Sequence, residues 1–284
     1  MRNRKKWLPI VLGAGTVLLG CAVLLVAKPD KDKVEANDLK PKWSVGDQWV
    51  VETQNQQMQS RVDLTDTDKD KDKDKTDRPD KDIKLPPVQW QFTVAKEEEL
   101  GKAKCLRVDV KCLVEGKQPI TTIWVDPKSM TIRQYETQLH VQGRYRTVKE
   151  SYQLQDGQPT PILCPGNALP LDMPLFRKGE AKGEDTFYYE AVMGELGTKD
   201  PGDVGFLTEV KQTMKSLKPD DVKGLIADDF SKDLESKPVV EVELTTPDKR
   251  TVRQLWRQEM PWPVYVDNGA TQARLIKYTP AKKN

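Results

Sequence analysis

The sequence predicts a mainly β protein, in which one or two α-helices cover an antiparallel sheet. Two observations lead to this fold class. Most of the chain after residue 43 alternates apolar and polar residues with the period of a half-buried strand. Short turns rich in Gly, Pro and Asp separate these runs, which is typical of strands joined by hairpins and not by crossover helices.

The most regular strand is predicted at residues 88–94. There Val88, Trp90, Phe92 and Val94 alternate with polar residues, so one face is apolar. Further strands are predicted at residues 106–114, 120–125, 133–141, 145–154, 240–244 and 251–256.

One stretch departs from this period. Residues 206–217 and 222–234 place apolar side chains at helical spacing, and Pro219 with Asp220 between them suits a helix start. We therefore expect helices near residues 204–217 and 220–235, lying on the sheet.

A weak internal repeat predicts two related halves. The motif W-x-x-G-D from residue 43 leads into one strand, and F-x-x-G-E from residue 176 leads into another. Each half also contains a hairpin with alternating valines, at residues 106–125 and 239–256. The two β units are placed at residues 43–158 and 176–284, with a proline-rich connection over 159–175.

Residues 1–27 have the order of a signal peptide or transmembrane anchor. A basic patch within residues 2–6 precedes residues 7–27, which carry no charge. At about 1.5 Å per residue, this run can cross the hydrocarbon core of a bilayer. Since the basic side stays in the cytoplasm, the rest of the chain is expected outside it.

Within this run, Leu18-Leu19-Gly20-Cys21 resembles the lipobox of bacterial lipoproteins, whose cysteine receives the lipid. The resemblance implies lipidation of Cys21 and a place in the bacterial cell envelope, with the folded part periplasmic. Residues 22–27 stay apolar, where mature lipoproteins are usually polar. An uncleaved anchor and free secretion after signal cleavage are therefore kept as alternatives.

Two polar segments have too few apolar residues to fold on their own. Residues 28–42 are predicted to be a flexible tether, and residues 66–82, where Asp and Lys alternate, a disordered loop inserted in a hairpin. Aspartates at alternate positions from residue 66 match the start of an EF-hand loop, but Lys71 stands where that loop needs glycine. We prefer a solvated loop to a calcium site.

The composition argues against nucleic-acid binding and against catalysis. Lys and Arg total 46 and Asp and Glu 44, so a net charge of +2 gives no field that attracts a polyanion. The single histidine, His140, is predicted on the polar face of its strand, and neither G-x-S-x-G nor C-x-x-C occurs. We expect no enzyme, no cofactor and no metal; a hydrolase with an unrecognised site is the third alternative.

The cysteines give no site of their own. Cys105 and Cys112 would face opposite sides of one strand, so they cannot pair with each other. Outside the cytoplasm Cys105 can pair with Cys164. Cys112 lies on the apolar face and is interpreted as a small buried residue.

The opening W-x-x-G-D-x-W-x-V-E from residue 43 and the stretch I-W-V-D-P from residue 123, followed by I-R-Q-Y-E from residue 132, resemble bacterial periplasmic lipoprotein carriers of the LolA-like class. The resemblance implies a curved, half-barrel-like sheet whose apolar face holds an acyl chain. It therefore implies a binding or carrier role.

We expect a non-catalytic cell-envelope protein, tethered to the membrane by its N-terminus or a lipid, that binds an amphiphilic ligand or a partner protein. The candidate ligand-binding residues are Trp90, Phe92, Trp124 and Trp262. Prolines on both sides hold Trp262 in an extended segment, and core packing is the competing interpretation. An envelope protein with a structural or assembly role and no small-molecule ligand is the alternative function.

Overall fold

The computed structural model describes residues 33–55, 86–113, 120–128, 130, 132–141, 144–151, 173–192 and 205–282. By its internal contacts the chain divides into Met1–Lys31 and Asp32–Asn284, so all described residues belong to the second unit. The predicted anchor with Cys21, the Asp/Lys segment 66–82 and Cys164 lie outside the described residues. Within those ranges, none of the helices is long and apolar enough to span a bilayer.

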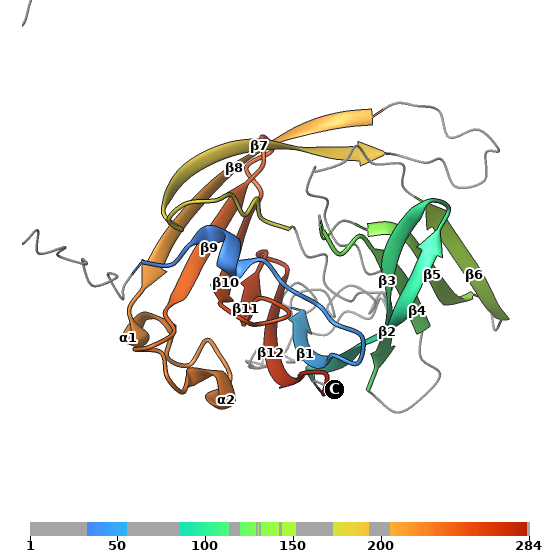
Figure 1. The fold of residues 1–284 in the computed structure, drawn as a ribbon, viewed down its shortest axis with the longest axis horizontal. Coiled ribbons are helices and arrows are strands. Elements are labelled where there is room, and N and C mark those ends of the chain that lie inside the picture. Colours follow the sequence, from blue (N-terminus) through green and yellow to red (C-terminus); the bar gives the residue numbers. More distant parts are fainter. Residues whose placement is uncertain are drawn as a thin grey trace, which may run out of the picture. The chain divides into compact units, whose positions relative to one another are not determined.

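The predicted mainly β class is confirmed, because the described strands form one antiparallel sheet (Figure 1). The strands are β1 (Gln48–Asn55), β2 (Val88–Leu100), β3 (Ala103–Cys112), β4 (Ile120–Val125), β5 (Ile132–Val141), β6 (Arg144–Ser151), β7 (Gly183–Val192), β8 (Gly205–Leu217), β9 (Val239–Thr245), β10 (Thr251–Arg257), β11 (Tyr265–Asp267) and β12 (Thr271–Thr279). Their order in space is β6-β5-β4-β3-β2-β1-β12-β11-β10-β9-β8-β7. Among these strands β6 and β7 have one neighbour each, so the sheet is not closed.

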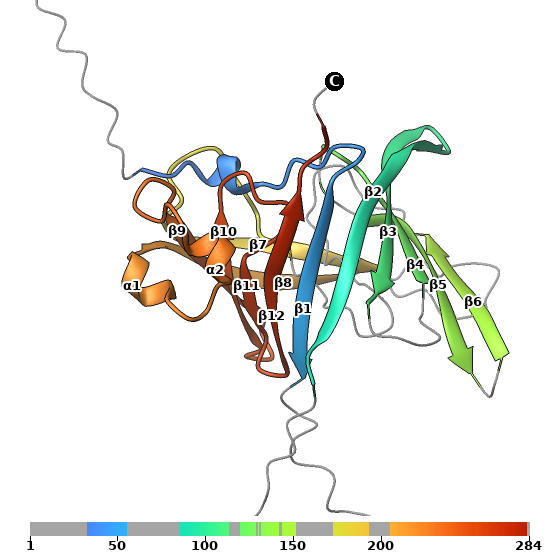
Figure 2. The same ribbon diagram turned by 90° about the horizontal axis from the view of Figure 1, so that it is seen from below.

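Period-two alternation explains why these segments are strands. On β2, Trp90, Phe92 and Val94 are buried, while the residues between them are half-buried. On the neighbouring β3, Val108 and Val110 continue the same buried face. At β2 and β3 the sheet therefore has one apolar face, and both views show that the sheet bends (Figures 1 and 2).

The helix expected at residues 204–217 is wrong, because this segment is β8. Val210 and Met214 are four residues apart, so their burial fits both a helix and a strand. The burial of Gln212 between them fits only a strand. Gln212 is buried although polar: its amide donates to the carbonyl of Leu175 at 3.0 Å and accepts from the N–H of Leu175 at 2.9 Å. Because two backbone bonds satisfy the amide, Gln212 occupies the buried face and completes the strand period.

The helix expected at residues 220–235 is present only as two single turns, α1 (Pro219–Val222) and α2 (Asp228–Ser231). Gly224 follows α1 with φ +79°, a left-handed conformation that ends a helix. Val222 and Phe230 are buried, which explains the apolar spacing without a continuous helix. The guanidinium of Arg257 donates to the carbonyls of Phe230 at 2.6 Å and Lys232 at 3.0 Å, which holds α2 against the sheet.

The part of the predicted tether that the structure describes, residues 33–42, is packed and not free. It contains a 3₁₀ turn, η1 (Ala36–Leu39), whose two end residues are buried. Its start is held to the segment before β7 by backbone bonds from Ala36 N to Gly179 O at 2.8 Å and from Ala181 N to Val34 O at 2.7 Å. The few apolar residues of this segment are enough to hold it in place, because they belong to a core that other elements also build.

Candidate functional site

A cleft of about 800 Å³ lies beside the β2–β5 part of the sheet. Three regions form it: the residues before β1, the ends of β2 to β5, and the segment before β7. The lining residues are Lys40, Glu97, Lys102, Ala103, Lys104, Cys105, Asp126, Pro127, Lys128, Met130, Arg133, Met173, Pro174, Leu175 and Phe176.

Five of these residues are basic and two are acidic, which sets the cleft apart from the nearly neutral chain. Lys102, Lys104 and Lys128 are exposed, so their ammonium groups are available at the mouth. Lys40 is half-buried and donates to the backbone carbonyl of Lys128. Partial burial lowers the pKa of Lys40, and the carboxylate of Asp126 acts in the opposite direction. Because a charged amine is costly to desolvate, an anion next to Lys40 would be held more strongly than at an open surface.

An ion pair lies deeper in the cleft. Arg133 of β5 donates to Asp126, at the end of β4, with Nη2 and Oδ2 3.0 Å apart, and both side chains are largely buried. Asp126 also accepts the backbone N–H of Lys128 at 2.8 Å, which fixes the β4–β5 turn. Met130 in this turn is buried and has φ +59°, a conformation that a residue with a side chain rarely adopts. The turn is therefore held in one shape by Asp126.

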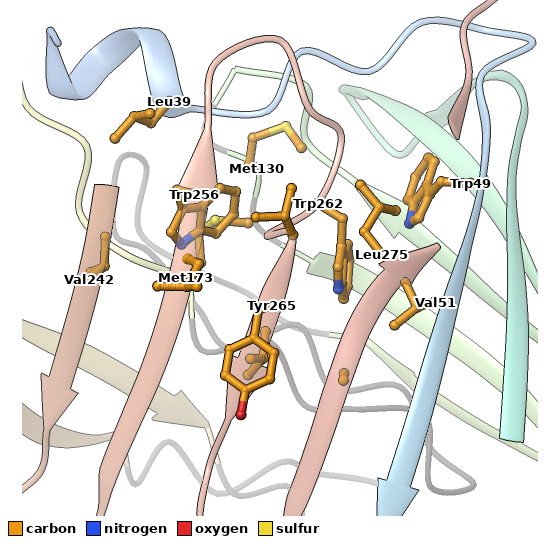
Figure 3. Close-up of a cluster of buried hydrophobic side chains, with 14 of the residues drawn as sticks. Leu39, Trp49, Val51, Met130, Met173, Val242, Trp256, Trp262, Tyr265 and Leu275 are labelled. Carbon is orange, nitrogen blue, oxygen red and sulfur yellow. The ribbon is translucent and has the colours of Figure 1, made fainter. Parts of the chain in front are cut away.

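Apart from Glu97 and Cys105, the remaining lining is apolar. Met130 and Met173 are buried, and Leu175 and Phe176 are half-buried. Figure 3 shows Met173 and Met130 among the core side chains, near Trp256 and Trp262. Phe176 makes an edge contact with Trp256, with ring centroids 5.1 Å apart. Beside the Arg133–Asp126 pair, the cleft therefore has an apolar wall that continues into the core.

Cys105 also lines the cleft, as a free and buried thiol. Burial raises its pKa, the charge of Asp126 raises it further, and Arg133 acts to lower it. A thiol of this kind is protonated at neutral pH and is a weak nucleophile. Since Cys105 is free, its predicted pairing with Cys164 finds no support; Cys112 is free too and only half-buried.

Three of the four aromatic residues predicted to bind a ligand lie in the core. Phe92 and Trp262 are in contact, with ring centroids 4.9 Å apart, and Phe92 also stacks on Trp49. Trp90 is buried on the same face of β2 and donates its indole N–H to Thr53 Oγ1 at 3.2 Å. Trp262 is only 1% exposed, so the two prolines beside it direct the ring into the protein.

Trp124 lies apart from these residues. It is half-buried, its neighbours Ile123 and Val125 are on the buried face, and its indole donates to Glu98 Oε2 at 2.6 Å. None of the four predicted aromatic residues is among the described residues that line the cleft. Their burial supports packing, and a ligand-binding role for them stays a prediction.

The residues that build the cleft were missed from the sequence for identifiable reasons. The polar residues around Lys40 predict a tether, and Asp126-Pro127-Lys128 predicts only a turn. The available signal was a hydrophobic residue close to each, Leu39 and Met130, both of which the structure buries.

The arrangement can hold an anionic group and an apolar group side by side. In the described ranges, no set of three or more His, Cys, Asp or Glu residues is placed to bind a metal ion. His140 lies on β5, and the described lining of the cleft holds no histidine.

Comparison of the chain with models of protein families, with curated proteins and with solved structures found no match.

Proposed function

We propose that this chain is a non-catalytic binding protein that holds an amphiphile with an anionic head group in the cleft. A single observation carries the proposal: four lysines line a cavity that also has an apolar wall, while the fifth basic residue, Arg133, is paired with Asp126. Its volume of about 800 Å³ is within the range of small-molecule sites. The head group would contact the lysines at the mouth, and the apolar part would lie against Met173, Leu175 and Phe176.

The proposed location is the bacterial cell envelope. Residues 1–27 would serve as signal or anchor, with Cys21 lipidated in the lipoprotein alternative, and the sheet would lie outside the cytoplasm. The resemblance to LolA-like carriers supports an amphiphilic ligand. In those proteins, however, the apolar face of the sheet holds the ligand, whereas here the cleft lies beside it.

We also propose that the sheet consists of two related six-stranded halves. A shift of six positions along the strand order brings β1 onto β7 and the hairpin β3–β4 onto β9–β10. These are the segments that the sequence repeat pairs. Strands β2 and β8 then coincide, and each has 13 residues.

The alternative function, a structural role without a small ligand, has one observation in its favour. The apolar face at the centre of the sheet is filled by its own aromatic rings, since Trp49 lies between Trp43 at 4.9 Å and Phe92 at 5.2 Å. Such packing fills this part of the face with the protein's own side chains and leaves a ligand no room there.

The two functions separate in a titration of residues 32–284, the unit that contains the whole described sheet. The probes are a fluorescent fatty acid with a free carboxylate and its uncharged methyl ester. We expect saturable binding of the acid at micromolar concentration and about tenfold weaker binding of the ester, because the ester offers the lysines no charge.

The Lys40→Met variant tests the cleft itself. It should reduce the preference for the acid over the ester, while Lys211→Met, an exposed lysine on β8 outside the cleft lining, should not. Circular dichroism of both variants establishes that they are folded. Saturable binding that is equal for acid and ester and indifferent to Lys40 would place the ligand elsewhere; no binding of either probe would favour the structural role.

A further inference from the structure

The described sheet has two open edges, β6 and β7, and they are complementary. Strand β6 reads RYRTVKES, with three basic residues and one acidic residue, whereas β7 reads GEDTFYYEAV, with three acidic residues and no basic one. Opposite charge on two open strands favours their pairing and disfavours the pairing of either with itself.

Neither edge strand contains proline, which commonly prevents strand addition. Strand β7 also lacks lysine, the other usual protection, whereas β6 carries Lys149. Instead, Tyr188 of β7 is 46% exposed, one of the three large apolar residues exposed to this degree among the described residues. An exposed aromatic residue on an unprotected edge is a feature of interaction surfaces.

Backbone groups of β7 are directed to the open side. The N–H of Thr186 donates to Oδ1 of its own neighbour Asp185 at 2.8 Å, although Thr186 lies opposite Lys211 of β8 in the ladder. This N–H therefore faces away from β8, where an added strand would meet it. Residues at alternate positions along β7 share this direction.

We infer that a second copy of this chain pairs with the open edge, β6 of one copy running antiparallel to β7 of the next. The register that sets Lys149 opposite Glu184 also sets Thr147 opposite Thr186. It thus matches a charge pair and a threonine pair, which are cross-strand pairs that stabilise sheets. Lys149, Thr147, Glu184, Thr186 and Tyr188 are all exposed.

The chain already contains the equivalent junction. In the proposed repeat, β1 corresponds to β7 and β12 to β6, and β1 pairs antiparallel with β12 over Gln48–Asn55. A β7–β6 contact between copies therefore repeats the contact that joins the two halves of one copy. Because the two surfaces differ, the assembly is head-to-tail and forms an open chain of copies or a closed ring.

Photo-crosslinking in the full-length chain in its membrane tests the contact directly. With p-benzoylphenylalanine in place of Tyr188, we expect an adduct of twice the chain mass whose crosslinked peptide comes from β6. The matched control replaces Val45, which is also 46% exposed but lies before β1, and should give no such adduct. An adduct with a different protein, a crosslink to β6 within one chain, or no adduct at all would each overturn the inference.

Charge exchange gives a second measurement, made on residues 32–284 by sedimentation. Lys149→Glu and Glu184→Lys should each raise the dissociation constant of the assembly about tenfold, because like charges then face each other. The variant with both changes restores opposite charges at every junction and should return to the parent value. If the double variant is as weak as the two single changes combined, the register is wrong. If all four proteins are monomers at every concentration, the contact does not exist. This inference does not depend on the cleft, so the ligand titration can fail without affecting it.

Discussion

Two tyrosines, one buried and one half-buried, hold their phenol groups where an anion is unfavourable. Tyr265 donates to Asp267 Oδ2 at 3.2 Å; burial first, and then the charge and hydrogen bond of Asp267, raise its pKa to about 12. Burial, again with a nearby carboxylate, that of Asp47, raises the pKa of Tyr278 to about 12. Both phenols are therefore protonated in the folded protein at a pH at which they ionise in the unfolded chain.

This difference predicts a loss of stability at high pH. The unfolded pKa of tyrosine is about 10, so the stabilisation is complete below pH 10 and is lost as the pH rises to 12. Tyr265→Phe should remove about 2 to 3 kcal/mol of that loss. The measurement is the free energy of unfolding by urea at several pH values, compared with the variant's own value at pH 7. An alkaline loss as large as the parent's would show that Tyr265 is not responsible.

At the same scale, single residues explain why part of the fold was predictable and part was not. Trp90, Phe92 and Val94 are apolar and buried, so their spacing predicted β2 directly. Gln212 is polar and buried, and only the backbone of Leu175, 37 residues away, makes that possible. A local pattern contains no information on such a distant partner, so the spacing of the apolar residues predicts a helix where the structure has β8.

Among the elements, the hairpin β1–β2 contains the longest charged insertion. The two strands pair in register up to Thr53 and Val88, and the Oγ1 of Thr53 donates to the carbonyl of Val88 at 3.2 Å. The residues that join the strands include the segment 66–82, which has no apolar residue. Since it has nothing to bury, the strands hold their register through their own contacts.

Deletion of residues 66–82, closed by a short Gly-rich turn, is therefore expected to change the free energy of unfolding by less than about 1 kcal/mol. Denaturant unfolding of the deletion variant and the parent measures the difference. A second variant, in which Gly and Ser replace residues 66–82 at unchanged length, separates the effect of the residues from that of loop length. A loss of several kcal/mol in both variants would show that the segment forms ordered structure.

The elements also divide by how far apart their partners lie in sequence. Hairpins such as β9–β10 were predicted because both strands and their turn are contiguous. The packing of residues 33–42 was not, because the backbone of Val34 and Ala36 bonds to residues 179–181, more than a hundred positions later. The cleft combines both cases: its turn at Asp126 was visible, whereas Lys40 and Met173 reach it only through the tertiary fold.

At the scale of the whole unit, the two proposed halves meet at β1 and β12. The carboxylate of Asp47, before β1, accepts the N–H of Ala281, after β12, at 2.7 Å. The buried residues on both sides of the β1–β12 pair belong to one continuous hydrophobic cluster. The strand order could not be predicted from the sequence, because it rests on pairing between the first and last strands of the chain.

A shared core predicts that the halves unfold together, and Trp262 is the residue that tests it. Trp262 lies in the loop between β10 and β11, but its ring packs against those of Phe92 on β2 and Trp49 on β1. The ring centroids are 4.9 Å and 6.1 Å away, respectively. Trp262→Ala should therefore lower the free energy of unfolding by about 3 to 5 kcal/mol. Because a cooperative unit loses stability as a whole, amide exchange should accelerate by the same factor in β2 and in β10.

Hydrogen exchange followed by mass spectrometry measures both strands in one experiment. Trp124→Ala is the matched control. The half-buried ring of Trp124 is not among the aromatic rings in contact with Trp262, and its indole donates to Glu98 instead. We expect Trp124→Ala to have a small effect confined to the strands around β4. If Trp262→Ala accelerated exchange in β10 to β12 and left β2 protected, the halves would be separate cooperative units. In that case each half would be stable even with the β1–β12 pairing broken. We do not expect this outcome, because the core is shared across that pairing.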